Sequence, residues 1–184
     1  MDDIQVARYD RVFDGYARGD EYLTRRSFTR HIRTLAEILG QSPDAPALAA
    51  FGEQLGTTWS QLAAVAGTDD DGQVSRDDFR AASLQITAGM RQAADEGLPW
   101  PFEEWVATLY QVIDADGDGH ITKQEYTDWL SALGLAEDTD IDGAFGGFDT
   151  NSDGNLSREE FSACYHQFWS DFDPSSPGLR WIGP

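Results

Sequence analysis

Two twelve-residue segments constrain this chain more than any other feature of its sequence. They are DADGDGHITKQE, residues 114–125, and DTNSDGNLSREE, residues 149–160. In each segment, side chains that carry oxygen alternate along the first half, a glycine stands sixth, an aliphatic residue stands eighth, and a glutamate ends the pattern. Alternate side chains can converge on one point only if the chain turns sharply, and glycine permits that turn. The sequence therefore predicts two compact loops, each enclosing a centre of negative charge.

The chemistry of these loops matches the twelve-residue EF-hand pattern. Calcium takes about six to eight oxygen ligands, and an EF-hand supplies them from positions 1, 3, 5, 7, 9 and 12, with a backbone carbonyl at position 7 and both oxygens of a glutamate at position 12. The predicted ligands of the first loop are Asp114, Asp116, Asp118, His120, Thr122 and Glu125. Those of the second loop are Asp149, Asn151, Asp153, Asn155, Ser157 and Glu160. His120 is expected to bind through its carbonyl oxygen and not through its imidazole.

Position 8 of each loop predicts how the two loops meet. Ile121 and Leu156 occupy it, and we expect them to exchange a short antiparallel backbone contact that couples the two sites. Thr122 and Ser157 follow, and each can cap the helix that leaves its loop. The predicted cofactors are two Ca²⁺ ions; Mg²⁺ can also occupy such sites at rest, and the sequence leaves that choice open.

A weaker copy of the pattern, GTDDDGQVSRDD, occupies residues 67–78. It opens with Gly67 where a carboxylate is expected, and the remaining ligand positions hold Asp69, Asp71, Gln73 and Asp78. Aspartate is one methylene shorter than glutamate, so its place at the end of the loop favours six-coordinate Mg²⁺ or no ion over calcium. We expect this loop to be metal-free or weakly occupied, and the sequence alone leaves the choice open.

The first loop, between Asp14 and Ser27, departs furthest from the pattern. Aligning Leu23 with the aliphatic position places Tyr16, Arg18, Asp20 and Ser27 at ligand positions. Arg18 would put a positive charge against the ion, and Ser27 cannot close the coordination shell. We therefore expect a structural loop that pairs Leu23 with Val74 of the segment 67–78.

Apolar residues recur at helical spacing along the whole chain and predict an all-α fold. We expect eight helices forming four EF-hand helix-loop-helix units, paired into two lobes that pack as one compact body. The predicted parts are an N-terminal pair with degenerate loops, a C-terminal pair with intact loops, and a tail that packs on the body. Their ranges are 1–95, 102–170 and 171–184, with a proline-containing linker, EGLPWP, at 96–101.

Charge and composition limit the partners. The formal net charge of −20 argues against nucleic acid and anionic membranes and favours cations. One cysteine, Cys164, excludes an internal disulfide and fits a reducing compartment. The N-terminus lacks the apolar segment of a signal peptide, and no apolar run approaches the length of about 20 residues that spans a bilayer. We expect a cytoplasmic monomer without a membrane span, and the sequence does not identify a protein partner.

The chain resembles the four-EF-hand sarcoplasmic calcium-binding proteins, and most closely their bacterial, calerythrin-type members. The resemblance rests on the four units, the long third helix, the loop 67–78, the segment FDTNSDGNLSREEF at 148–161, and a tail after the last helix. It implies an intracellular calcium buffer or signal modulator and not an enzyme. The first loop of that family often binds calcium, and the loop near Asp14 departs from the family's pattern.

Two other functions remain open. A calcium sensor would bind a partner through a flexible, methionine-rich groove, but this chain has only Met1 and Met90. The end of the chain, 166–184, also resembles that of coelenterazine photoproteins and luciferin-binding proteins. That resemblance implies an apolar ligand in an aromatic cavity, and the alternative is a tail that fills the core. The residues that could line such a cavity are His166, Phe168, Trp169, Trp181, Trp59, Trp105 and Trp129.

Catalysis has little support in the sequence. Cys164 and His166 are two positions apart on the last helix and do not face each other. Cys164 lies near an apolar stripe and is expected to be a buried, inert thiol. His31 is expected on a solvated face of the second helix. No glycine-rich phosphate loop and no hydrolase motif is present.

Overall fold

The structure is a computed structural model that describes residues 3–97 and 102–170. Its α-helices are α1 (Asp3–Ala17), α2 (Arg25–Thr29), α3 (His31–Ile38), α4 (Pro46–Val65), α5 (Arg76–Asp95), α6 (Glu103–Ile113), α7 (Lys123–Leu133), α8 (Ile141–Phe148) and α9 (Arg158–Ser170). A short 3₁₀ helix, η1 (Ala136–Asp138), follows α7. Two-residue strands lie in the four loops: β1 (Tyr22–Leu23), β2 (Val74–Ser75), β3 (Ile121–Thr122) and β4 (Asn155–Leu156). The predicted tail, 171–184, and most of the predicted linker lie outside the described residues.

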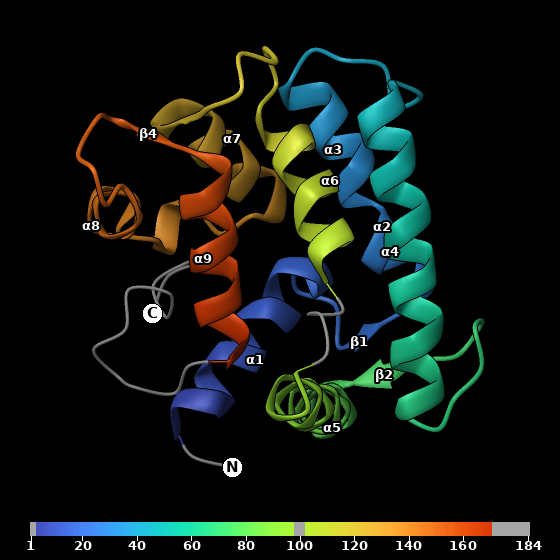
Figure 1. Cartoon of the computed structure of the whole chain (residues 1–184). Helices are drawn as coiled ribbons and strands as arrows, with labels where there is room; N and C mark the ends of the chain where they lie inside the picture. The colour runs from blue at the N-terminus through green and yellow to red at the C-terminus, as the bar shows by residue number, and fades with distance from the viewer. Residues whose placement is uncertain (1–2, 98–101, 171–184) are drawn as a thin grey trace.

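The four helix-loop-helix units pair as the sequence predicts. Strand β1 joins β2 with Leu23 opposite Val74, and β3 joins β4 with Ile121 opposite Leu156, both antiparallel. The two pairs then pack on each other, because α4 lies against α6, α3 against α7 and α5 against α9 (Figure 1). One continuous apolar core runs through both halves, so the predicted all-α fold with one compact body is confirmed.

The expected second helix is divided. The described residues contain nine α-helices where eight were expected, because Arg30 separates α2 from α3. The amide of Arg33 donates to the carbonyl of Arg30 at 3.1 Å, which is a tighter, three-residue turn than an α-helix makes. The side chain of Arg30 turns back to Asp20 at 3.0 Å and to the carbonyls of the first loop. The break lets one arginine tie the exit helix of the first loop to its entry helix.

The expectation that His31 faces solvent is wrong. Its side chain is only 2% exposed and lies between the rings of Tyr16 and Phe51, with centroids 5.0 and 6.0 Å away. Burial lowers the pKa of His31 to about 4, although a hydrogen bond with the backbone of Phe28 acts in the opposite direction. The positive charges of Arg18 and Arg30 lower it further. His31 is therefore neutral in the folded protein at neutral pH.

This buried imidazole predicts a loss of stability in mild acid. Between pH 6.5 and about 4 the unfolded chain binds a proton that the folded chain excludes, so the free energy of unfolding falls as the pH is lowered through that range. A pKa depressed from 6.5 to about 4 corresponds to about 3 kcal/mol. Urea unfolding at a series of pH values should show this loss, and His31→Phe should remove most of it.

His166→Gln is the matched control, because His166 is exposed. Its stability should follow that of the parent protein at every pH. If His31→Phe loses as much stability as the parent between pH 6.5 and 4, another group is responsible.

Candidate calcium sites

The loop between α6 and α7 brings three carboxylates to one point. Helix α6 stops at Ile113, and Asp114 leaves the helical conformation with φ −67° and ψ 77°. Gly117 and Gly119 then take positive φ values of 72° and 88°, which curl the chain back toward Asp114. One oxygen from each of Asp114, Asp116 and Asp118 lies within 4.8 Å of the other two. Three negative groups at this separation could hold a cation.

Backbone amides hold these carboxylates in place. The amide of Gly119 donates to Asp114 Oδ2 at 3.1 Å, and the amide of Asp118 donates to Asp116 Oδ1 at 3.1 Å. The amide of His120 donates to Asp118 Oδ1 at 2.8 Å. Each aspartate therefore has one oxygen fixed by the loop itself, as in an Asx-turn, and the carboxylates cannot swing apart to relieve their repulsion.

The other oxygen of Asp114 is in an unusual environment. Asp114 Oδ1 is buried and has no hydrogen-bond partner among the described residues. A buried carboxylate oxygen without a partner is unfavourable, so such groups are normally paired or bound to a metal. Burial raises the pKa of Asp114, and the charges of Glu125 and Asp118 raise it further. A divalent cation fits this donor set, because it would supply the missing partner and neutralise the repulsion.

Glu125 closes the loop from the first turn of α7. Its Oε2 accepts from both the amide and the hydroxyl of Thr122 at 2.8 Å, and the hydroxyl of Thr122 in turn caps the helix. Its Oε1 accepts from the amide of Ala115 at 2.9 Å, on the far side of the loop. Glu125 is only 8% exposed. Both of its oxygens are thus held at the end of the loop where a bidentate ligand is needed.

The loop between α8 and α9 repeats this geometry. Ser152 and Gly154 take positive φ values of 60° and 87° at the positions that Gly117 and Gly119 occupy in the first loop. Asp149 Oδ2 accepts from the amide of Gly154 at 2.9 Å. The remaining predicted ligands follow the same order, because the amides of Asp153 and Asn155 donate to Asn151 Oδ1 and Asp153 Oδ1 at 2.8 and 2.9 Å.

Glu160 takes the closing position of this loop. Its Oε2 accepts from the amide and hydroxyl of Ser157 at 2.9 and 2.8 Å, and its Oε1 accepts from the amide and hydroxyl of Thr150 at the same distances. Burial acts to raise the pKa of Glu160, but these hydrogen bonds outweigh it and lower the pKa to about 2. Glu160 is therefore ionised over the whole physiological range and available to a cation.

Tyr110 joins the two loops, and the sequence analysis did not identify it. Its hydroxyl group lies 2.7 Å from the carbonyl oxygen of Gly119 and 3.1 Å from that of Leu156, so it donates to a carbonyl of either loop. The contact reinforces the pairing of Ile121 with Leu156. A tyrosine on the apolar face of a helix, four positions before the loop, was the available signal, but only the folded chain shows where the hydroxyl points.

The loop 67–78 does not have the backbone of the two intact loops. Gly67 takes a φ of +78° to end α4, and the next amide, of Thr68, reaches back to the carbonyl of Ala63 at 2.9 Å. Asp70 and Gly72, at positions 4 and 6, are not among the residues with positive φ. The chain therefore lacks the curl that aims alternate side chains at one point. Gly67 stands where the helix must end.

Side chains of this loop are also engaged elsewhere. Asp70 forms an ion pair with Arg25, accepts from the hydroxyl of Ser60 at 2.5 Å, and its carbonyl accepts from the indole of Trp59 at 2.9 Å. Asp78 accepts from the hydroxyl of Ser75 at 2.5 Å, which caps α5. Asp69, Asp71 and Gln73 are exposed. We propose that this loop holds no calcium.

The first loop uses its ligand positions for packing and ion pairs. They are Tyr16, Arg18, Asp20 and Ser27. The ring of Tyr16 stacks on Phe28 at 4.1 Å, and Asp20 pairs with Arg30 at 3.0 Å. Ser27 forms a capping box at the start of α2. The predicted pairing of Leu23 with Val74 is confirmed, and the structural role of the loop is consistent with these contacts.

The chain is similar in sequence to known EF-hand proteins. Residues 103–165, which include both intact loops, match the family model described as an EF-hand domain pair. The chain is 29% identical over 155 residues to sarcoplasmic calcium-binding protein 1 of Astacus leptodactylus, covering 82% of this chain and 79% of that protein. It is 27% identical over 162 residues to calerythrin of Saccharopolyspora erythraea, covering 88% and 87%. The chain is an EF-hand protein. In particular, it is a homologue of the sarcoplasmic calcium-binding proteins and calerythrin.

Solved structures support the same fold. Calcium-loaded apo-aequorin from Aequorea victoria superimposes with a TM-score of 0.74 at 15% identity, over 95% of this chain and 94% of that one. The photoprotein clytin gives a TM-score of 0.74 at 19% identity, over 98% and 95%. Sequence identities this low support a shared arrangement of the four helix-loop-helix units and no more specific conclusion.

The geometry of the loop 67–78 predicts that restoring its ligands does not restore a site. Gly67→Asp combined with Asp78→Glu supplies the one missing carboxylate and lengthens the closing one, but the backbone still lacks positive φ at positions 4 and 6, and an aspartate at residue 67 is strained at a φ of +78°. Calcium calorimetry should give the same stoichiometry as the parent protein. One additional bound ion would show that the backbone readily adopts the calcium-binding form.

Proposed function

We propose that this protein binds two calcium ions, one in each of the loops 114–125 and 149–160, through the twelve ligands predicted from the sequence. The single observation that carries this proposal is the cluster of Asp114, Asp116 and Asp118, in which Asp114 Oδ1 is buried without a partner. Calcium binding is further supported by the homologues, which are named as calcium-binding proteins. Oxygen-only donors favour Ca²⁺ or Mg²⁺ over softer metals, and Mg²⁺ is the expected competitor at rest.

The ion acts by neutralising charge. Without a cation, the loop 114–125 holds four carboxylates close together, and their mutual repulsion opposes the folded loop. Calcium removes that repulsion and fixes Glu125 and Glu160 against their ions, so the starts of α7 and α9 become anchored. The β3–β4 contact and the hydroxyl of Tyr110 carry the change from one loop to the other. Binding at one site therefore favours binding at the second.

A buffer or signal modulator fits the structure better than a sensor. A sensor opens to expose a flexible apolar groove, often rich in methionine. Here the described core is closed and rich in aromatic side chains, and the large apolar residues that are partly exposed, Tyr22, Ile38, Val65 and Leu84, are 36–40% exposed and come from separate elements. An intracellular location is consistent with the homologues and with the buried single cysteine.

No helix of the described residues has the length and apolar character needed to cross a membrane. Cys164 is 3% exposed, and burial raises its pKa, so the thiol is the buried group that the sequence predicts. We propose a binding protein and not an enzyme on the strength of the loops and the homologues.

Removing one closing oxygen tests the two sites separately. Glu125→Gln and Glu160→Gln should each weaken calcium binding at their own loop by roughly 100-fold or more, because affinity depends on the charge of the ligands and on bidentate closure. Calorimetry with and without Mg²⁺ should show two ions for the parent and one for each variant. The control is Glu159→Gln, which removes an exposed acid beside Glu160 and should retain both ions. Unchanged stoichiometry in the double variant would disprove the assignment.

The choice between buffer and sensor has a simple test. If the protein is a buffer, saturating calcium should change the fluorescence of an apolar dye such as anilinonaphthalene sulfonate by less than about twofold, because little apolar surface becomes exposed. An increase of the size that sensor EF-hand proteins show, together with binding of amphipathic helical peptides, would establish a sensor.

A further inference from the structure

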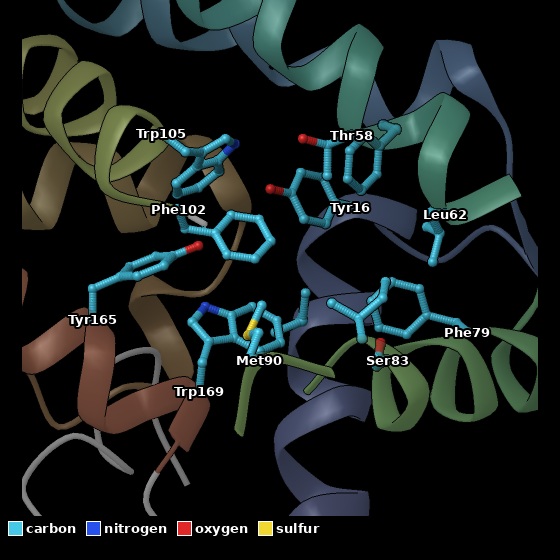
Figure 2. Close-up of a pocket in the computed structure, with 13 residues that line it drawn as sticks. Tyr16, Thr58, Leu62, Phe79, Ser83, Met90, Phe102, Trp105, Tyr165 and Trp169 are labelled. Atoms are coloured by element: carbon cyan, nitrogen blue, oxygen red, sulfur yellow. The ribbon is translucent and has the colours of Figure 1, made fainter. Parts of the chain in front are cut away.

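An apolar cavity lies where the two EF-hand pairs meet. Its volume is about 80 Å³, and thirteen described residues line it (Figure 2). The N-terminal half supplies residues of α1, α2, α4 and α5, among them Tyr16, Thr58 and Ser83. The C-terminal half supplies Trp105 of α6 and Tyr165 of α9. Protein interiors rarely contain a void much larger than a water molecule, so a space of this size at a junction needs an explanation.

The lining selects for an aromatic, uncharged occupant. Seven of the thirteen residues are aromatic, Met90 adds a polarisable sulfur, and no charged side chain is among them. Aromatic rings and sulfur contact another ring edge-to-face or at its edge, which favours an aromatic ligand over an aliphatic one of equal size. The net charge of −20 further disfavours an anion. An apolar cavity has too few polar partners to hold water well.

One residue that lines the cavity, Trp105, carries a polar atom without a partner. Trp105 Nε1 is buried and makes no hydrogen bond among the described residues. Figure 2 shows this nitrogen on the side of the indole that faces Thr58. Since indole N–H only donates, its missing partner is an acceptor. Buried indole N–H groups usually have such a partner, and Trp59 Nε1 has one in the carbonyl of Asp70 at 2.9 Å.

The size of the cavity limits the ligand further. An engineered apolar cavity of about 150 Å³ binds benzene, so a cavity of about 80 Å³ must widen to admit one ring and is too small for a ligand of several rings. A second cavity of about 40 Å³ shares Tyr16, Trp105, Tyr165 and Trp169 with the first. These shared side chains separate the two spaces, and a rotation of one of them would give room for a short substituent.

We propose that this cavity binds one small, neutral, single-ring aromatic molecule that carries an oxygen acceptor, such as an aromatic alcohol. The ring lies among the aromatic side chains, and its oxygen accepts from Trp105 Nε1. The site is separate from the calcium loops, and its ligand contacts no calcium ligand named above. Its failure would therefore leave the calcium proposal intact.

This site differs from the cavity that the sequence resemblance suggests. Trp105 and Trp169 line it, but Trp59 does not, because its indole is turned to Asp70. Trp129 and Phe168 line only the smaller neighbouring cavity. His166 is exposed, and Trp181 lies outside the described residues. Four of the aromatic residues foreseen from the sequence therefore surround two small spaces, and the larger one draws more of its lining from α5 than from the last helix.

Two matched probes test the proposal on the full chain. Benzyl alcohol and ethylbenzene have nearly the same shape, and only the alcohol carries an acceptor. Both should bind one equivalent by calorimetry, and both should shift the indole proton resonance that Trp105→Phe removes from the NMR spectrum. Trp105→Phe should weaken benzyl alcohol about three- to tenfold, the usual effect of one hydrogen bond, and leave ethylbenzene within about twofold.

A filling substitution provides the second test. Ser83→Leu places two additional non-hydrogen atoms into the cavity and should weaken both probes by at least about tenfold. Ala88→Leu on the same helix is the matched control, because Ala88 is exposed, and it should leave both affinities unchanged. If Ser83→Leu does not fold, Met90→Ala serves instead. It enlarges the cavity and should admit 1-naphthol, which the parent excludes.

The results separate the proposal from its alternatives. If neither probe binds the parent protein, with or without calcium, the proposal is overturned. Binding that Ser83→Leu and Trp105→Phe leave unchanged would place the probes elsewhere and overturn it as well. Equal weakening of both probes by Trp105→Phe would refute the hydrogen bond and restrict the site to hydrocarbons.

Discussion

The structure depends on holding mutually repelling carboxylates together in one small loop. Asp114, Asp116 and Asp118 present oxygens within 4.8 Å of one another, and nothing in water would keep them there. The loop does so by taking positive φ at Gly117 and Gly119 and by fixing one oxygen of each aspartate with a backbone amide. Those amides are available only because the loop is anchored at both ends, by α6 and α7, and at its middle by β4. The apolar core thus holds in place the helices and the strand that keep these charges close together.

The two halves of the chain answer the same charge problem in different ways. In the C-terminal half the negative charges converge where a cation from solution could bind. In the N-terminal half arginine side chains neutralise the acids instead. Arg25 forms an ion pair with Asp70, and Arg30 forms one with Asp20. Exposed ion pairs of this kind contribute only about 0–1 kcal/mol each, but they need no external ion. We therefore expect the N-terminal pair to keep its form whether or not calcium is present, and the ion-dependent change to be confined to the C-terminal pair.

Sequence spacing predicted those features that depend on local order alone. Alternation of acids and the aliphatic eighth position gave the pairing of Ile121 with Leu156 and of Leu23 with Val74 in the correct register. It failed where a residue's role depends on distant contacts. The spacing also did not show that Gly67, at a ligand position, ends α4 with a positive φ. His31 looked solvated because the break at Arg30 could not be foreseen, and Tyr110 could not be linked to Leu156 before the loops were paired.

The calcium loops and the cavity are connected through shared helices. Helix α6 carries Trp105 and leads directly into Asp114, while α9 carries Glu160 in its first turn and Tyr165 five residues later. An ion that anchors the ends of these helices also fixes two walls of the cavity. Linkage is reciprocal, so whatever factor calcium applies to the affinity of the cavity, an occupant of the cavity applies to the affinity for calcium. A rigid aromatic core can transmit such a constraint without the large opening that a sensor undergoes. A protein that stays closed could therefore act as a calcium buffer whose affinity for calcium depends on the occupant of the cavity.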